Sequence, residues 1–393
     1  MLSLDDPLPL LVTCARGLAP YLEGELRALE LEPEEARDTG VSLRATLRQA
    51  YRLNLELRTA YHVLVRVGEL FCSDGDALYR GARQLPWEEW IPEDGYVSVA
   101  SRVDTPSVQN SMYPNLKLKD AIVDRIADRR GRRPDAGPLR DRSVVALRWF
   151  GDEARIYLDT SGTKLSDRGY RRSPHKAPLR ETLAAGLLLA AGYDGSQPLL
   201  DPMCGSGTIA IEAALIASGR APGLLRSEFG LKHLLGYDEQ AWEELRAAAR
   251  RAARGQAPAP IVASDRDPAA IEAARRNAKT AGVEHLIDFR CCDFEQTVVP
   301  EPGEQGGILL VNPEYGVRLG ATEELQAEHH RLGDFMKQRL RGYTAWLLTG
   351  SRTLAKSVGL RSNRKLPFWN GDLECRLLRY ELYAGSKKRR HQA

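Results

Sequence analysis

The 393-residue chain has only six cysteines, and no two of them are spaced as a CxxC pair. They also form no metal-like cluster with the seven histidines. These absences argue against a disulfide framework and against a zinc site, and they predict buried thiols in a reducing, cytoplasmic setting. We therefore expect no bound metal ion.

Long hydrophobic runs are scarce as well. The longest, from Leu183 to Ala191, is interrupted by Gly186 and is well short of the roughly 20 apolar residues that a membrane-spanning helix needs. The amino terminus carries Asp5 and Asp6 where a signal peptide carries basic residues. We expect neither export nor a membrane partner.

A strong excess of one charge is missing too, because 56 basic residues face 53 acidic ones. The charge is nevertheless unevenly placed. Basic residues gather in the segments 113–142 and 164–180 and in the Lys387–Arg390 run. Such patches can neutralise phosphates, but solvated helix faces or a disordered tail would give the same pattern. The remaining composition, 43% hydrophobic and 28% charged, is typical of a globular protein long enough for two or three domains.

The first half of the chain has the pattern of an α+β region without a nucleotide-binding loop. Apolar alternation predicts strands, and apolar residues at helical spacing predict helices. The expected strands are 8–14, 61–67, 96–103 and a hairpin of 144–150 with 154–158, and the expected helices are 18–29, 46–60, 76–85 and 113–130.

The second half alternates strands and helices in the manner of a doubly wound, Rossmann-like α/β fold. The expected helices are 179–190, 208–217 and 268–281, and the expected strands are 197–200, 261–264, 286–291, 308–311 and 343–348. The stretch 219–260 is too long for an ordinary loop. We interpret it as an insert that either lies over the substrate side or acts as a structural brace.

The segment Asp201-Pro-Met-Cys204-Gly205-Ser-Gly207-Thr208 ends one of these strands and opens a helix. Glycines allow a ligand to approach the backbone closely, and the helix amino terminus offers free N–H groups. The Asp201 carboxylate can take an ammonium group. Ala210 completes a dinucleotide-like glycine pattern, but no acidic residue ends a strand about 20 residues later, as that site requires. We expect a nucleoside cofactor here, and a bulky residue at Gly207 should block it without unfolding the chain.

Two further strands end in aspartates. Asp265 is placed to accept from both ribose hydroxyls of such a cofactor, with Asp267 as a rival that could equally cap the next helix. Asp293 can accept from an adenine amine while Phe294 packs on the ring. A turn role is the alternative for Asp293.

The reactive feature is Asn312-Pro313-Glu314-Tyr315, which follows an apolar strand. The Asn312 side-chain oxygen and the Pro313 carbonyl could accept both hydrogens of an aromatic amine and stabilise the charge that develops as the amine attacks a sulfonium methyl. Tyr315 would stack on the base. A base inside a duplex is out of reach, so the substrate should be single-stranded or flipped. The pattern indicates methyl transfer from S-adenosylmethionine to a base nitrogen.

With these residues in hand, the chain resembles the bacterial 23S ribosomal RNA guanine N2-methyltransferases, in which a THUMP RNA-binding region precedes a Rossmann-like methyltransferase domain. The resemblance is carried by 54–60, 77–82, 159–162, 168–171, 177–183, 201–208 and 221–224. It implies guanine N2 as the acceptor, RNA as the partner and no obligate protein partner. A transfer RNA enzyme and a non-catalytic RNA-binding assembly factor are the alternatives.

The chain departs from the family pattern in two ways. Glu314 stands where the family usually has a second proline, which adds a carboxylate beside the reacting amine. Some relatives also carry a second methyltransferase domain that makes a different base modification, and we expect that activity to be absent.

The resemblance and the composition together predict a domain order. It is a ferredoxin-like part (1–70), a THUMP domain (71–162), a basic hinge (163–178), the methyltransferase domain (179–384, with insert 219–260) and a basic tail (385–393). In the hinge we expect Lys164, Arg168, Arg171 and Arg172 to grip RNA phosphates. The alternative is that these cations pair with carboxylates and hold the halves together.

Overall fold

The computed structural model describes residues 4–106, 108, 110, 112–172, 179–314 and 322–383. The chain folds into two compact units. Unit 1 comprises Met1–Arg168 and Ala221–Ala252, and unit 2 comprises Gly169–Arg220 and Ala253–Ala393. The chain therefore passes from one unit to the other three times.

Unit 1 is built on an eight-stranded sheet in the order β2-β3-β1-β4-β8-β7-β5-β6. Its strands are β1 (Leu8–Cys14), β2 (Pro33–Arg37), β3 (Gly40–Ala45), β4 (Ala60–Phe71), β5 (Tyr96–Asp104), β6 (Asp135–Ala136), β7 (Ser143–Phe150) and β8 (Glu153–Asp159). The twelve-residue β4 pairs with β1 along its first half and with β8 along its second. It thus joins a ferredoxin-like half-sheet to the sheet of the following domain.

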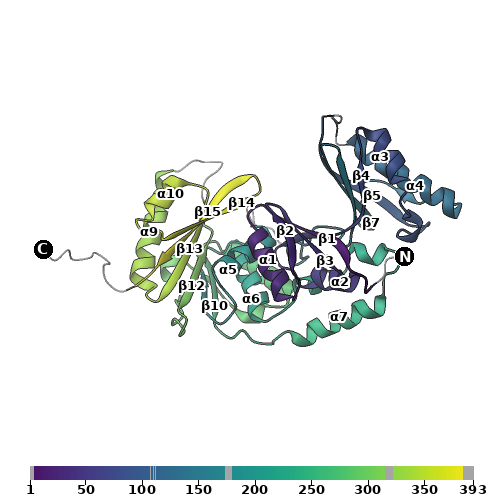
Figure 1. Cartoon of the computed structure of the whole chain (residues 1–393). Coiled ribbons are helices and arrows are strands. Elements are labelled where there is room, and N and C mark those ends of the chain that lie inside the picture. The colour runs from purple at the N-terminus through teal and green to yellow at the C-terminus, as the bar shows by residue number, and fades with distance from the viewer. Residues whose placement is uncertain are drawn as a thin grey trace. The chain divides into compact units, whose positions relative to one another are not determined.

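The helices of unit 1 have clear local causes. They are α1 (Ala19–Ala28), α2 (Leu47–Glu56), α3 (Gly75–Ala82) and α4 (Met112–Arg130). Thr46 and Gln49 form a capping box that starts α2, and the Asp74 side chain accepts from the Ala77 N–H at the start of α3. Figure 1 shows α3 and α4 together on one side of β4, β5 and β7.

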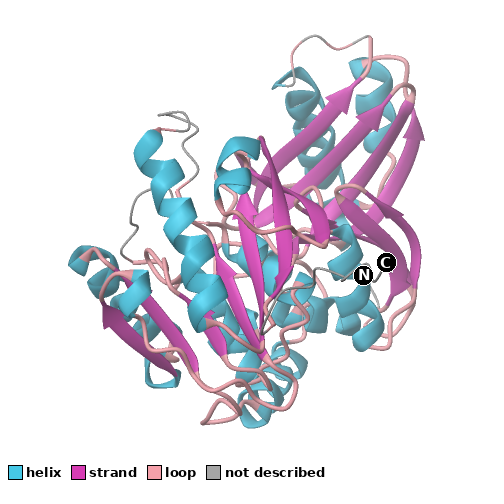
Figure 2. Cartoon of the chain, turned by 90° about the vertical axis from the view of Figure 1, so that its left-hand side faces the viewer, coloured by secondary structure: helices cyan, strands magenta, loops and turns pink. Residues whose placement is uncertain are grey.

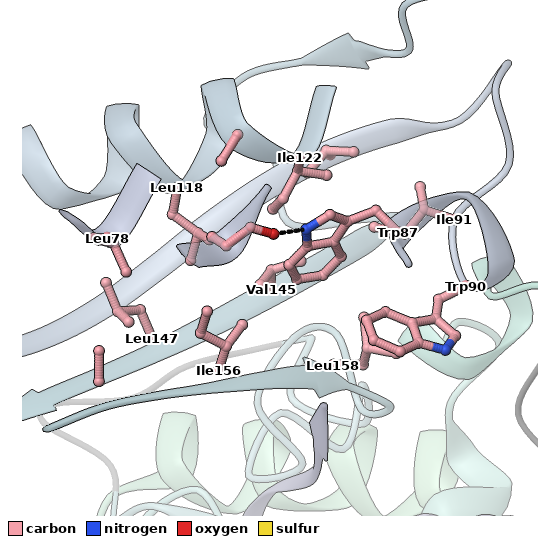
Figure 3. Close-up of a cluster of buried hydrophobic side chains, with 14 of the residues drawn as sticks. Leu78, Trp87, Trp90, Ile91, Leu118, Ile122, Val145, Leu147, Ile156 and Leu158 are labelled. Atoms are coloured by element: carbon pink, nitrogen blue, oxygen red, sulfur yellow. Dashed lines mark hydrogen bonds between the residues drawn. The ribbon is translucent and has the colours of Figure 1, made fainter. Parts of the chain in front are cut away.

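The core between α3, α4 and this part of the sheet contains three tryptophans, Trp87, Trp90 and Trp149, and Figure 3 labels the first two. The rings of Trp87 and Trp90 meet edge to face with their centroids 5.3 Å apart. The buried Trp87 indole N–H donates to the Ala82 carbonyl at 2.7 Å, which satisfies the polar atom that burial would otherwise penalise. Strand β7 contributes its inward-facing residues Val145 and Leu147 to the same core.

The insert packs within unit 1. Its elements are two short 3-10 turns, η2 (Pro222–Leu225) and η3 (Gly230–His233), and α7 (Glu239–Ala252). Trp242 of α7 is buried between Tyr51 and Phe229, with ring centroids 5.8 and 4.9 Å away. A side chain at Gly223 would come within 2.6 Å of the Leu55 backbone, so η2 lies directly against α2. These contacts fit the bracing alternative for the insert, and a place over the substrate side stays a prediction.

A buried arginine, Arg226, binds the insert to segment 161–167, which lies just before the chain first leaves unit 1. The Arg226 guanidinium donates to the carbonyl oxygens of Ser161, Thr163, Lys164 and Asp167 at 2.6–3.2 Å. Burial lowers its pKa to about 10. These bonds fix segment 161–167 to the insert by backbone acceptors rather than by an ion pair.

Unit 2 is built on a seven-stranded sheet in the order β11-β10-β9-β12-β13-β15-β14. Its strands are β9 (Leu199–Asp201), β10 (Ile261–Asp265), β11 (Ile287–Cys291), β12 (Gly307–Val311), β13 (Tyr343–Thr349), β14 (Arg364–Asn370) and β15 (Leu373–Glu381). Its helices are α5 (Glu181–Ala190), α6 (Thr208–Ala217), α8 (Pro268–Ala281), α9 (Glu323–Arg339) and α10 (Arg352–Ser357). Figure 1 shows α5 and α6 on one side of the sheet and α9 and α10 on the other, as a doubly wound sheet requires.

The predicted fold class is confirmed, with one correction. Strands β9 to β13 are parallel, as predicted, but β15 runs antiparallel to β13 and pairs with β14 as a hairpin. The sheet is therefore mixed, since two strands joined by the short turn at Gly371 must be antiparallel. No helix in the described part of the chain is long and apolar enough to cross a membrane.

Candidate active site at the carboxyl ends of the unit 2 strands

The predicted site residues lie at the carboxyl ends of neighbouring parallel strands. Asp201 ends β9, Asp265 ends β10, Asp293 follows β11 and Asn312 follows β12. The strand order reverses between β9 and β12, because β10 and β11 lie on one side of β9 and the later strands on the other. Ligands of open α/β sheets bind at such a reversal, outside the carboxyl ends of the strands.

The turn after β9 is shaped by two glycines with positive φ. Gly207, at φ +82°, is the N-cap of α6, and a Cβ there would lie 2.9 Å from the Ala274 Cβ of α8. Gly205, at φ +51°, differs, because a Cβ there would meet no atom of the described chain within 4 Å. Gly207 therefore closes the packing of two helices, whereas Gly205 faces open space. The expectation that a bulky residue at Gly207 leaves the fold intact is wrong for this reason.

The Asp201 carboxylate is completely buried, and neither oxygen makes a well-formed hydrogen bond within the described residues. Burial raises its pKa well above the ordinary value of 3.8, and the nearby Asp265 raises it further, although the backbone N–H groups of Met203 and Ala210 act in the opposite direction. A buried carboxylate with unused acceptor capacity is costly unless a cation or donor reaches it. This state fits an incoming ammonium group.

Cys204 and Thr208 frame the same turn and are both buried. The Cys204 N–H donates to the Ser264 carbonyl at 2.9 Å, which ties the turn to β10. Burial, followed by the Asp201 charge, raises the pKa of the Cys204 thiol, so the thiol is neutral and acts by packing. Thr208 is the first residue of α6, where backbone N–H groups are free of intrahelical partners.

Asp265 supports the glycine turn. Its Oδ2 accepts from the Gly205 N–H and its Oδ1 accepts from the Asp267 N–H, both at 2.9 Å. Each carboxylate oxygen can accept a second hydrogen bond, so both could still receive ribose hydroxyls. The rival, Asp267, caps α8, because its side chain accepts from the Ala269 N–H ahead of Pro268. That is the helix-cap alternative considered for this residue.

Asp293 and Phe294 form a short turn held by an arginine that sequence reasoning missed. The Asp293 Oδ1 accepts from the Glu295 N–H at 3.0 Å and from Arg331 of α9 at 2.9 Å. The Arg331 guanidinium lies 5.0 Å from the centre of the Phe294 ring, which packs edge to face on Phe335. Phe294 is thus part of the core, and its packing on a cofactor ring stays a prediction. No sequence pattern links residues 293 and 331, because only the fold brings α9 to the end of β11.

Asn312 presents an unused acceptor at the end of β12. Its side-chain Oδ1 is buried and has no hydrogen-bond partner within the described residues. Pro313 is buried beside it and Glu314 is exposed. Tyr315 lies outside the described residues. An orphaned amide oxygen in this position fits the predicted acceptor for an amine hydrogen.

The four predicted RNA-contacting cations differ in their surroundings. In unit 1, Lys164 is exposed, with its ammonium 5.1 Å from the Tyr61 ring centre. Arg168 is 1% exposed and donates to the Leu165 and Arg58 carbonyls. We therefore leave Arg168 out of the proposed RNA contacts, because leaving those bonds would strand buried carbonyls.

The two arginines of unit 2 also make structural contacts. Arg171 forms an ion pair with Glu181 at 3.0 Å and donates to the Leu179 carbonyl at 2.8 Å. The Arg172 backbone N–H donates to the Asn277 side chain. Arg171 thus pairs with a carboxylate within unit 2, and RNA contact by Arg172 stays a prediction. The rest of the hinge, 173–178, and the tail from 384 lie outside the described residues.

Three family models match the chain. Residues 9–64 match the RlmL ferredoxin-like domain, 72–159 match the THUMP domain, and 168–379 match the RMKL-like methyltransferase domain. The last match covers more than half of the chain. The predicted THUMP and methyltransferase resemblance is confirmed.

Individual relatives agree. The chain is 39% identical over 387 residues to the ribosomal RNA large subunit methyltransferase K/L of Syntrophotalea carbinolica, covering 96% of this chain and 54% of that protein. It is 34% identical over 375 residues to a Synechocystis protein named "Putative RNA methyltransferase slr0064", covering 95% of this chain and 97% of that protein. The chain thus spans about half the length of the K/L relatives and nearly all of the Synechocystis one.

A solved structure supports the same conclusion. The protein described as "SMU.472, a putative methyltransferase complexed with SAH" superposes with a TM-score of 0.86 at 27% identity, covering 97% of this chain and 99% of that one. A possible methylase from Clostridium difficile gives a TM-score of 0.85, also at 27% identity, over 97% of this chain and 100% of that one. On the family models and these relatives, the chain belongs to the RMKL-like methyltransferase family, with a THUMP domain ahead of the methyltransferase domain.

Proposed function

We propose that this chain transfers a methyl group from S-adenosylmethionine to the exocyclic N2 amine of a guanine in 23S ribosomal RNA. The observation that carries the proposal is the buried Asn312 oxygen at the end of β12, which has no hydrogen-bond partner among the described residues and lies at the reversal of strand order beside β9. The family and the named relatives support methyl transfer to RNA. The roles proposed for the site residues follow from their positions at the strand ends.

The cofactor site would be held by unit 2. Asp201 would take the ammonium of the cofactor, Gly205 would leave room for its methionine part, and Asp265 would accept from its ribose. Asp293, fixed by Arg331, would accept from the adenine amine. When bound, S-adenosylmethionine supplies an electrophilic methyl group on a positively charged sulfur.

Asn312 would act on the acceptor amine. Its Oδ1 and the Pro313 carbonyl would each accept one amine hydrogen, which holds the nitrogen lone pair toward the methyl carbon and away from the ring. As the nitrogen–carbon bond forms and the carbon–sulfur bond breaks, positive charge develops on the nitrogen, and both oxygens stabilise that charge. One amine proton then leaves to water, and the methylated amine is neutral.

The test is methylation of purified RNA classes. The purified chain is incubated with methyl-labelled S-adenosylmethionine and 23S ribosomal RNA, 16S ribosomal RNA or transfer RNA, and digested nucleosides are analysed by mass spectrometry. We expect labelled N2-methylguanosine from 23S ribosomal RNA alone. Label in transfer RNA would show that the chain is instead a transfer RNA methyltransferase. A chain that binds S-adenosylhomocysteine but labels none of the RNAs would contradict the proposal that it is an enzyme.

A further inference from the structure

Within the described residues of unit 1, α3 and α4 cover one face of strands β4, β5, β7 and β8. The opposite face, which we call the helix-free face, carries a row of arginines beside a row with two aromatic rings. The face toward α3 and α4 holds the core residues Trp149, Leu147 and Ile156. Side chains alternate between the faces along each strand, so their neighbours in sequence point the other way. Figure 2 shows the molecule from the left-hand side of Figure 1, so strands β4, β5 and β7 lie in front of α3 and α4 there.

The outermost row of this helix-free face contains two exposed phenylalanines. Phe71 of β4 pairs with Glu153 of β8, and Glu153 pairs in turn with Phe150 of β7. Paired residues of neighbouring strands share a face, so both rings flank Glu153. Phe71 is 81% exposed and Phe150 is 44% exposed. Two large apolar rings exposed along one row of a sheet leave apolar surface available for a partner.

The next row inward, two residues along each strand, is mostly arginine. Glu69, Arg155, Arg148 and Arg102 pair across β4, β8, β7 and β5 in that order. Arg155 is neutralised by ion pairs with Glu69 and Glu153, both at 2.9 Å. Within the described residues neither Arg102 nor Arg148 has an ion-pair partner, and the Arg102 guanidinium lies 6.0 Å from the centre of the Phe150 ring.

Arg102 and Arg148 occupy directly paired positions, and like charges in such positions destabilise a sheet. Arg148 is half-buried, and burial followed by the charges of Arg102 and Arg37 lowers its pKa, against an opposing effect of Tyr157. Asp104 pairs with Phe150 in the outer row. A hydrogen bond from Arg37, helped by the charge of Arg155, lowers the pKa of Glu35 of β2. The two adjacent cations therefore have unused capacity for an anion.

We propose that this helix-free face, formed by Phe71, Phe150, Arg102 and Arg148, binds a single-stranded segment of the substrate RNA, with bases stacked on the rings and phosphates on the arginines. The inference rests on the proposed function for the identity of the RNA. Rings beside unpaired cations are the combination that single-stranded nucleic acids require, and double-stranded RNA offers no base faces for stacking.

The helical side of the same domain provides the contrast. Two of its cations are paired, since Lys117 contacts Asp76 at 2.5 Å and Arg133 contacts Asp124 at 3.3 Å. It also carries an exposed apolar residue, Leu116, at 50% exposure. Leu116 and Lys117 match the proposed surface in apolar character and charge but lie on α4, and Arg133 follows that helix. They serve as controls.

The experiment measures binding of a fluorescein-labelled single-stranded RNA to the full-length chain by anisotropy, without cofactor. We expect Phe71→Ala and Phe150→Ala each to weaken binding roughly 5- to 100-fold, the range for loss of one base stack. Arg102→Ala should reduce the slope of log affinity against log salt by about 0.7. Leu116→Ala and Lys117→Ala should bind like wild type, and melting temperatures should confirm folding.

Wild-type affinity in the Phe71→Ala, Phe150→Ala double variant would overturn the proposal, as would equal losses in the control variants. Equal affinity of wild type for a duplex of the same sequence would also overturn it. If the double variant bound RNA normally but no longer formed dimers that the wild type forms, the face would be assigned to contact with a second copy of the chain. Because binding is measured without methyl transfer, these outcomes are distinct from failure of the proposed function: a wild-type chain that methylates no RNA leaves the binding result unaffected.

Discussion

Alanine substitutions at Gly205 and Gly207, in the turn after β9, should affect folding stability and cofactor affinity to different extents, because each alanine has a different physical cost. At Gly207 the cost has two parts. A non-glycine residue at φ +82° is strained by about 1–2 kcal/mol, and a Cβ at 2.9 Å from Ala274 adds about 1–3 kcal/mol of overpacking. At Gly205, with φ +51° and open space, only the strain of about 1–2 kcal/mol applies.

These sums translate into melting temperatures. For a domain of this size each kcal/mol shifts the melting temperature by about 2–4 °C. We therefore expect Gly207→Ala to lower that of unit 2 by about 4–20 °C and Gly205→Ala by about 2–8 °C. In isothermal calorimetry with S-adenosylhomocysteine, the larger loss should instead belong to Gly205→Ala. We expect it to bind roughly 5- to 100-fold more weakly than wild type, because its methyl group enters the space assigned to the cofactor.

A double variant isolates the contact. Ala274→Gly removes the methyl group that Gly207→Ala would strike, so Gly207→Ala with Ala274→Gly should be less destabilised than the sum of the two single variants. Additive losses would refute the packing role of Gly207. Wild-type affinity of a folded Gly205→Ala chain for S-adenosylhomocysteine would refute the cofactor position.

Three further predictions concern single side chains. Asn312→Ala should slow single-turnover methyl transfer at least roughly a hundredfold with cofactor and RNA affinity unchanged, whereas Glu314→Pro should be tolerated; a near-normal Asn312→Ala rate would exclude the proposed chemistry. Burial raises the pKa of Asp201, so the cofactor-free folded state binds this proton more tightly than the unfolded state, and its stability should fall as pH rises from about 4 through the raised pKa. Asp201→Asn should flatten that fall in thermal melts while weakening S-adenosylhomocysteine binding, and an unchanged pH profile would contradict the assignment. Lys164→Ala should lower the salt slope of RNA binding by about 0.7–0.9 and lower the melting temperature less than Arg168→Ala does, because the Arg168 guanidinium serves buried carbonyls. Arg168→Ala should leave the salt slope unchanged, and a shared response would show that the two cations have the same role.

The sequence predicted the fold best where local pattern and tertiary structure agree. Helices α6 and α8 begin and end where expected, because a positive-φ glycine starts the first and an aspartate cap followed by proline starts the second. The antiparallel hairpin of β14 and β15 and the helix α9 were not predicted. The two strands lie beyond the last expected one, and the alternation of β9 to β13 gave no signal for a reversal of direction.

The candidate site shows the same division. The strand-end positions of Asp201, Asp265 and Asn312 follow from chain order, so the sequence could indicate them. The buried state of Arg168 and the role of Arg331 could not be predicted, because both depend on contacts with residues 110 and 38 positions away. A basic residue in a sequence shows its charge but not which carbonyl or carboxylate the fold places against it.

The central claim is that Asn312 directs methyl transfer to guanine N2. The most direct measurement is mass spectrometry of nucleosides from 23S ribosomal RNA of cells whose only copy of this protein is either wild type or Asn312→Ala. We predict that one N2-methylguanosine per RNA is present with wild type and absent with Asn312→Ala, at equal protein levels. The same N2-methylguanosine content in both strains would contradict the account.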